Sequence, residues 1–340
     1  MKLKLIIPFI LLLLTGCWNY NELNDIALIT SMSIDKENNN FLVSVGIANT
    51  NKDEITLYSG NGKSISEAIK NIELYIPKKL YFGHLSVIII SDNIAKEGLE
   101  RLSNYILRSK DIPKNTFLLI SKDTQAKQIL KSISPLDTFP SITISSKFLD
   151  INNNTQTTTF NNYIQAIKKI GIEPIIPAVS LVQNEDKNKT KLDTIAIFKK
   201  DKLIKIATEK ESKGINIILN KQDEILIPIT CNNTIIQTNK INTKTKFKNN
   251  TLYINVTASG IIKELDCNNK ETIKETENEI KKIIENSIKL SKENNTDILG
   301  FGNTIYKHNP KYYNKNIFKN IKIKTKVKFN LNKEGNIEKN

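Results

Sequence analysis

Histidine, arginine, tryptophan and cysteine are all scarce in this chain of 340 residues, which has two histidines, one tryptophan and three cysteines. A catalytic or pH-sensing histidine needs a partner group that orients it, and the sequence offers none at a recognisable spacing. No H-E-x-x-H, G-x-S-x-G, P-loop or calcium-loop motif is present. The sequence therefore predicts a protein that is not an enzyme, with no catalytic residue, no cofactor and no bound metal.

Arginine is limited to Arg101 and Arg108, so lysine supplies nearly all of the 50 basic residues behind a formal charge of +15. Proteins that read nucleic acids rely on arginine for bidentate contacts with bases and phosphates. The excess of lysine, asparagine and isoleucine is typical of an AT-rich genome. We expect a solvated basic surface and no nucleic-acid partner, although an anionic membrane surface would also attract the lysines.

A long apolar segment is missing as well, and the longest run, Leu5–Leu14, follows the basic residues Lys2 and Lys4. Ten helical residues extend about 15 Å, half of a bilayer core of about 30 Å. This length is typical of the core of a signal peptide and is too short for a membrane-spanning helix. The run ends in Leu14-Thr15-Gly16-Cys17, which resembles the bacterial lipobox.

The small residues Thr15 and Gly16 leave room for a signal peptidase, and the Cys17 sulfur is a nucleophile for diacylglyceryl transfer. We expect residues 1–16 to be a signal peptide, Cys17 to carry fatty acyl chains such as palmitate, and residues 17–25 to form a tether. Two acyl chains give stable anchoring, here to the outer, extracytoplasmic face of a membrane. The alternative is an ordinary secretory signal in which the cysteine falls by chance.

The other two cysteines, Cys231 and Cys267, have neither C-x-x-C spacing nor a histidine nearby, so a zinc site is not expected. Outside the cytoplasm a disulfide between them is chemically allowed. We favour free or loosely paired thiols.

The first half of the chain, residues 26–190, alternates between strand and helix patterns. Apolar runs or alternation predict strands at 26–34, 41–48, 84–91 and 116–121, with a turn at 35–40. Helices are predicted from a capping box at Ser64–Glu67, from Asp92 through Leu99 and Ile106, from Asp123 to Leu130, and at 159–170. This order predicts an N-terminal α/β domain with adjacent parallel strands.

The second half, residues 191–340, has a different pattern. A hairpin is predicted from 194–198 and 203–207, further strands at 215–219, 224–230, 252–262 and 321–331, and a long amphipathic helix at 271–292. The fold class is therefore α+β with more than one domain, the C-terminal domain being a mostly antiparallel sheet packed with a long helix. The polar stretch 183–191 marks the predicted boundary at residue 190, with a long hairpin loop as the alternative.

A few polar residues outside the leader were weighed as site residues. His84 is predicted to be a hydrogen-bonded core or sheet-end residue at the start of a buried strand, and His308 to lie in a loop. Asp297 and Glu264 stand in the sequence as isolated acids. Gly300-Phe301-Gly302 is superficially similar to part of a phosphate-binding loop. Because it follows a helix, we interpret it as a turn that closes the long helix, with Gly300 near the C′ position.

Three stretches together resemble the Ger(x)C family, the C subunits of bacterial spore germinant receptors. They are GCWNYNELND at Gly16–Asp25, KLYFGHL at Lys79–Leu85, and DILGFG at Asp297–Gly302 followed by Pro310. The order and spacing match over essentially the whole chain. Asn19 stands where the family usually has aspartate, and Tyr312, Tyr313 and Phe318 stand where tryptophans are usual.

The resemblance implies a non-enzymatic lipoprotein with several α+β domains. It would be assembled with two integral membrane partners, the A and B subunits of the receptor, in the spore inner membrane. Its role would be scaffolding or signal coupling in nutrient-triggered germination. The alternatives are an extracytoplasmic solute-binding lipoprotein of a transporter, disfavoured because its two lobes should be alike, and a cell-wall hydrolase with distant paired carboxylates.

Overall fold

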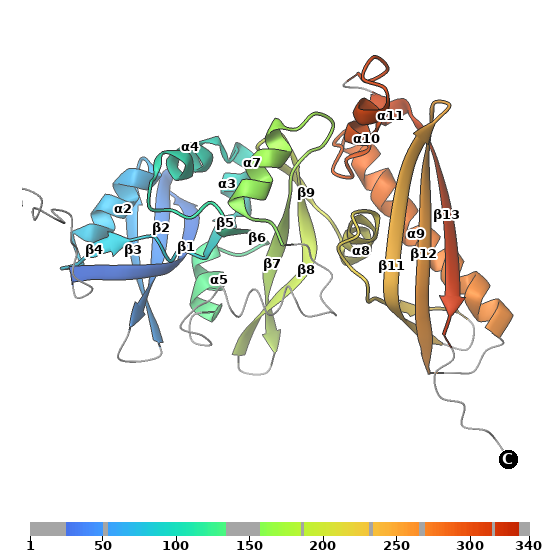
Figure 1. Cartoon of the computed structure of the whole chain (residues 1–340). Coiled ribbons are helices and arrows are strands. Elements are labelled where there is room, and N and C mark those ends of the chain that lie inside the picture. The colour runs from blue at the N-terminus through green and yellow to red at the C-terminus, as the bar shows by residue number, and fades with distance from the viewer. Residues whose placement is uncertain are drawn as a thin grey trace, which may run out of the picture.

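The computed structural model describes residues 25–49, 54–133, 157–184, 187–230, 234–264, 269–314 and 317–332. The leader, the predicted lipid site Cys17 and the two other cysteines lie outside these residues. The described chain forms two β-sheets with their helices, one after the other along the molecule (Figure 1). No helix in the described ranges is both long enough and apolar enough to cross a bilayer.

The first sheet has nine strands in the order β3-β2-β1-β5-β6-β7-β8-β9, with β4 paired beside β1. The strands are β1 (Ile26–Glu37), β2 (Asn40–Asn49), β3 (Glu54–Gly62), β4 (Lys79–Tyr81), β5 (Val87–Ser91), β6 (Phe117–Ser121), β7 (Ile175–Asn184), β8 (Lys187–Lys199) and β9 (Lys202–Ile206). The central strands β1, β5, β6 and β7 are parallel, and antiparallel hairpins extend both ends. The predicted α/β alternation with adjacent parallel strands is confirmed.

Helices cover both faces of this sheet, which explains the unbroken apolar runs in its central strands. They are α2 (Ile65–Glu73), α3 (Asp92–Glu97), α4 (Glu100–Arg108) and α7 (Phe160–Lys168) on one face and α5 (Ala126–Ile133) on the other. In β5, Ile88 and Ile90 pack into the first core, whereas Val87 and Ile89 pack against α5. Successive side chains of one strand therefore fill two separate cores.

Four local predictions about this half are wrong. The helix expected from Asp92 to Ile106 is two helices, because Gly98 has a φ of 125° between α3 and α4. Asp92 does not cap α3 but is its first residue and forms an ion pair with Lys96. Asp123 does not cap α5 either, because the carboxylate of Asp35 accepts hydrogen bonds from Ala126 N at 2.7 Å and Lys127 N at 2.8 Å. The turn before β2 is shorter than expected and consists of Asn38 and Asn39, which leaves Asp35 inside β1.

The second sheet has four strands in the order β10-β11-β12-β13. The strands are β10 (Leu226–Pro228), β11 (Ile235–Lys248), β12 (Thr251–Glu264) and β13 (Lys322–Leu331), and the helices are α8 (Glu209–Ile218), α9 (Asn269–Glu293), α10 (Phe301–His308) and α11 (Ile317–Asn320). The first two pairings are antiparallel and β12–β13 is parallel. The long helix α9 packs on one face of the sheet, in agreement with the predicted fold class (Figure 1).

In two places in this half the structure differs from what the sequence predicted. The stretch 215–219, predicted as a strand, forms the end of α8 and its C-cap Leu219, because Thr208 and Glu211 form a capping box that starts a helix just before the isoleucines. Strand β11 was not predicted, although Asn249 and Asn250 have the positive φ values of a tight hairpin turn. Its alternation of lysine with threonine and asparagine hid the strand, because few of its inward residues are strongly apolar.

The polar stretch 183–191 lies in the β7–β8 hairpin, which is the alternative that the sequence left open. Strands β8 and β9 continue the first sheet, and the chain then enters α8, which packs on α9 beside the second sheet. The division of the chain into domains at residue 190 stays a prediction.

Candidate functional site at the junction of the two sheets

A cleft with a volume of about 520 Å³ opens where the first sheet meets the second. One wall consists of the loop between α7 and β7 and the turn between β8 and β9. The other consists of the loop between α9 and α10 and the segment leading into α11. The charged and phenolic side chains that line the cleft are Lys169, Glu173, Lys199, Lys200, Asp297 and Tyr313.

Asp297 lines this cleft and caps α10. Its Oδ1 accepts a hydrogen bond from Phe301 N at 3.1 Å, and its Oδ2 accepts one from Gly302 N at 2.5 Å. Burial of the carboxyl group outweighs these bonds and raises the pKa of Asp297 to about 7. Asp297 is therefore a proton-binding group that titrates near neutral pH.

The Gly300-Phe301-Gly302 segment opens a helix and does not close one, so its interpretation from the sequence was wrong. The long helix α9 ends at Glu293, and Gly300, with a φ of 68°, is the N-cap residue of α10. The amides of Phe301 and Gly302 are bonded to the Asp297 carboxylate of the same chain, so the anion at this helix start is internal. Asp297 is likewise not an isolated acid.

Glu173 is the second acidic residue in the cleft and comes from the first half of the chain. Its Oε2 accepts a hydrogen bond from Lys200 N at 2.6 Å. Burial raises the pKa of Glu173, while the nearby charges of Lys199 and Lys200 act in the opposite direction. The negative charge of Glu173 also raises the pKa of Asp297, by less than burial does.

Two glycines bring the backbones of the two halves together at this point. Gly171 has a φ of 70°, and a Cβ atom at Gly171 would lie 2.3 Å from the carbonyl carbon of Gly302. A Cβ at Gly302 would lie 2.9 Å from Oδ2 of Asp297. Glycine is thus required at Gly171 for its positive φ and at both positions for the close approach of two chain segments.

Backbone atoms from both halves are hydrogen-bonded across the junction. Glu173 N donates to the carbonyl oxygen of Asp297 at 2.9 Å, and Asn303 N donates to the carbonyl oxygen of Gly171 at 2.8 Å. Thr296 Oγ1 donates to the carbonyl oxygen of Phe198 at 2.5 Å. Main-chain atoms cannot change rotamer, so the two backbone–backbone bonds fix the positions of the α9–α10 loop and the first sheet relative to each other.

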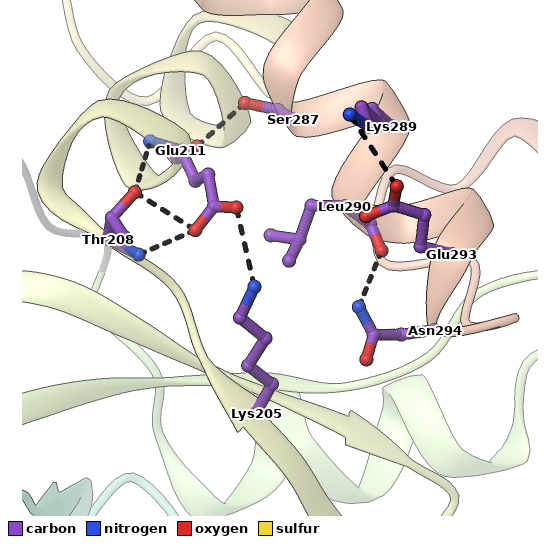
Figure 2. A network of polar contacts seen from close by, with 8 residues as sticks. All are labelled: Lys205, Thr208, Glu211, Ser287, Lys289, Leu290, Glu293 and Asn294. Atoms are coloured by element: carbon purple, nitrogen blue, oxygen red, sulfur yellow. Dashed lines mark hydrogen bonds and ion pairs between the residues drawn. The ribbon is translucent and has the colours of Figure 1, made fainter.

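A second link runs through α8, which follows the last strand of the first sheet (Figure 2). Thr208 and Glu211 form the capping box of α8, and Lys205 of β9 forms an ion pair with Glu211 at 3.5 Å. Ser287 Oγ of α9 donates to the carbonyl oxygen of Glu211 at 2.7 Å. Gly214 lets α8 approach α9 closely, because a Cβ there would lie 2.4 Å from the carbonyl oxygen of Ile283.

Taken together, these groups can bind and release a proton at a contact between two folded units. The cleft also presents the cationic groups of Lys169, Lys199 and Lys200 beside the two carboxyl groups. In the part of the chain that the structure describes, no cluster of three histidine, cysteine or acidic side chains is arranged to hold a metal ion.

The remaining residues considered from the sequence do not gather here. His84 is exposed ahead of β5 and contacts the ring edge of Tyr81, with ring centroids 6.0 Å apart, so it is not a core residue. His308 is the last residue of α10, where its Nδ1 lies 2.9 Å from the carbonyl oxygen of Thr304, and is not in a loop. Glu264 is the last residue of β12. Cys17, the predicted lipid site, lies outside the described residues.

Glu173, Gly171 and Lys200 were missed because nothing in the sequence near them points to Asp297, more than 90 positions further along. The only local signal was Gly171 directly after the predicted helix at 159–170, which is typical of a helix end.

Comparisons with known proteins cover nearly the whole chain. A family model described as "Spore germination protein N-terminal domain" matches residues 19–181. A second, described as "Spore germination B3/ GerAC like, C-terminal", matches residues 193–335. The junction cleft is therefore lined by residues from both matched regions.

Among individual proteins, spore germination protein KC of Bacillus subtilis (strain 168) is 27% identical over 357 residues, covering 89% of this chain and 86% of that protein. Spore germination protein B3 of the same organism is 23% identical, with 97% of each chain covered. The crystal structure of the GerBC protein matches with a TM-score of 0.56 at 18% identity, over 88% of this chain and 96% of the other. This structural likeness supports the fold.

Proposed function

Because the chain belongs to the GerAC-like family, the C subunits of spore germinant receptors, we propose that it is a membrane-anchored lipoprotein subunit of such a receptor. In this role it is a non-enzymatic scaffold and signal-coupling component in nutrient-triggered germination. The observation that carries the proposal is the match of two consecutive germination-protein domains over residues 19–181 and 193–335.

The anchoring part of the proposal is supported by the leader. Its short apolar run stops directly before Leu14-Thr15-Gly16-Cys17, and two acyl chains on Cys17 would hold the protein stably at a bilayer. The proposed location is the outer face of the spore inner membrane, and the proposed partners are the integral membrane A and B subunits. Confinement to the membrane surface raises the effective concentration of the protein near such partners.

The coupling part is supported by the junction. Backbone hydrogen bonds and the contact between Gly171 and Gly302 join the two matched regions. A displacement of one region by a membrane partner would therefore be passed to the other as a rigid movement, because close-packed backbone has little room to yield.

A solute-binding lipoprotein is the alternative function, and the fold disfavours it. Such proteins have two similar lobes around a cleft, whereas here a nine-stranded sheet meets a four-stranded one of different strand order.

The proposal is tested by Cys17→Ala in the full chain, expressed in spores that lack the natural copy. We expect more than about a tenfold loss of the protein from the membrane fraction, because no acyl chain remains to hold it, and loss of germination in response to nutrients. The matched control is Cys231→Ala, which also removes one thiol, at a position far from the leader in the sequence, and should leave both readouts unchanged. Membrane retention and normal germination of Cys17→Ala would contradict the proposal.

A further inference from the structure

The outward face of the second sheet carries lysines on three neighbouring strands. Side chains of these strands alternate, so that one set packs against α9 and the other set faces solvent. In Figure 1, α9 lies behind these strands and no helix covers their near side. The exposed lysines, which we call the lysine face, are Lys240, Lys244, Lys246 and Lys248 of β11, Lys263 of β12, and Lys322, Lys324, Lys326 and Lys328 of β13.

The strand register places these lysines in rows. Lys246 and Lys324 lie on either side of Tyr253, and Lys244 and Lys326 lie on either side of Asn255. Ideal sheet geometry spaces rows on one face by about 7 Å and the two outer strands by about 10 Å. The lysine face is therefore a regular array of positive charges, with an aromatic ring among them.

Acidic residues are almost absent from these three strands, where Glu264 at the very end of β12 is the only one. None of the nine lysines forms an ion pair with a residue in the described part of the chain, whereas α9, on the other face, carries pairs such as Lys281–Glu285 and Lys289–Glu293. Helix α9 contains six lysines and six glutamates. A genome rich in lysine codons would add lysine to both faces and would not remove the acids from one of them.

Protection of an exposed sheet edge explains only part of this pattern. Lysines on an edge strand such as β13 prevent pairing with other chains. Residues 240–248 of β11 lie beyond its pairing with the short β10 and are an edge as well, but edge protection does not require the absence of acidic residues from all three strands.

We propose that the lysine face lies against the anionic headgroups of a lipid bilayer. Lysine ammonium groups are attracted to an anionic leaflet without needing specific geometry, and the nine lysines spread their charge over three adjacent strands. Tyr253, partly buried between Lys246 and Lys324, is a residue type that favours the membrane interface.

The predicted anchor would hold the protein at the membrane through β1, which lies toward the opposite end of the molecule from the second sheet (Figure 1). The attraction acts only within about 8–10 Å at physiological salt. The seven residues between Cys17 and Asp25 span at most about 25–29 Å when fully extended, which keeps the folded body near the surface. The anchor leaves orientation free, and the lysine face would then select one orientation. The inference uses the proposed anchor only for proximity.

The test measures lysine reactivity in the mature full chain, reconstituted into vesicles of phosphatidylcholine alone or with about one third phosphatidylglycerol. An amine-acetylating reagent followed by peptide mass spectrometry gives a rate for each lysine. We expect Lys244, Lys246, Lys324 and Lys326 to react at least about fivefold more slowly in the anionic vesicles, and about 0.5 M salt to remove the difference. Lys281 and Lys289 of α9 should react equally in both vesicles.

Matched charge variants test the cause. Lys244→Gln/Lys326→Gln should abolish the protection of Lys246 and Lys324, because it removes two charges from the centre of the face. Lys281→Gln/Lys289→Gln removes two charges from α9 and should leave the protection intact. All four side chains are exposed, so we expect both variants to fold, which equal unfolding transitions would verify.

The outcomes separate this inference from the proposed function. Equal reactivity in both vesicle types would overturn it. Protection in spore membranes but not in anionic vesicles would assign the face to an acidic protein and would also overturn it. If phosphatidylcholine vesicles do not retain the chain but anionic vesicles protect its lysine face from acetylation, the proposed lipid anchor is contradicted. The proposed membrane contact of the lysine face is then supported.

Discussion

Asp35 in the first sheet and Asp297 at the junction have the same local role in different surroundings. Each carboxylate accepts hydrogen bonds from backbone amides at the start of a helix, α5 for Asp35 and α10 for Asp297. Asp35 reaches its helix from 91 residues away in the sequence, whereas Asp297 precedes α10 directly. Burial raises the pKa of both groups, and for Asp297 the value is about 7.

The difference lies in what else each residue contacts. The helix that Asp35 caps belongs to the same sheet unit, so its bonds hold one unit together. The main-chain oxygen of Asp297 accepts a hydrogen bond from Glu173 N. The negative charge of the Glu173 side chain also raises the pKa of Asp297. The protonation of Asp297 is therefore linked to the contact between the two halves, whereas that of Asp35 is not.

The largest expected effect is on the pH dependence of stability. An acid whose pKa is raised by folding binds its proton more tightly in the folded state, so its contribution to the free energy of unfolding is highest below its ordinary pKa of 3.8 and falls as the pH rises to about 7. Over that whole window the change amounts to about 4 kcal/mol. Asp297→Asn has no titrating carboxyl group at this position, so its free energy of unfolding relative to the wild type should rise with pH. Urea unfolding between about pH 4.5 and 7.5 measures this difference.

Other titrating groups at the cleft do not account for the expected difference between the wild type and Asp297→Asn. Glu173, Tyr313, Lys199 and Lys200 are present in both chains, so most of their contribution cancels in the difference. Asp35→Asn should show the same sign. Parallel stability curves for the wild type and Asp297→Asn would contradict the linkage.

The next effect tests the close approach at the junction. Gly171→Ala should cost about 3 kcal/mol, because it combines the strain of a positive φ with overlap against the backbone of Gly302. Gly300→Ala is the matched control, because its φ of 68° is nearly the same but the nearest atom to its Cβ would be a side-chain carbon at 3.3 Å. It should cost only about 1–2 kcal/mol. Equal losses in urea unfolding would mean that the overlap does not matter.

The smallest expected effect compares a buried cap with an exposed one. Asp35→Ala should cost about 2 kcal/mol or more, because it leaves the amides of Ala126 and Lys127 without an acceptor inside the protein. Thr208→Ala removes an exposed cap of α8 and should cost about 1 kcal/mol. Hydrogen exchange at Ala126 and Lys127 should rise in Asp35→Ala alone. A greater loss in Thr208→Ala would reverse the ranking.

The sequence predicted those elements whose signals are local. The Ser64 cap of α2 is confirmed by a hydrogen bond from Glu67 N to Ser64 Oγ at 3.1 Å. The strand at β5 and the long helix α9 are also confirmed, because continuous apolar residues and a helical apolar stripe can be recognised within a few positions. The failures came where two local signals competed. In α8 the isoleucine run favoured a strand, but the capping box and the fit of Gly214 against α9 decided for a helix.

By itself, the sequence determined the short leader with its lipobox-like end, the family resemblance, the α/β order of the first half and the sheet-and-helix pattern of the second. Only the tertiary structure decided that Asp35 caps α5, that Asp297 meets Glu173, and that nine lysines share one face. The physical reason is distance along the chain. Periodicity and capping depend on neighbours a few residues away. These contacts instead depend on strand order and register, which are determined jointly by residues far apart in the sequence.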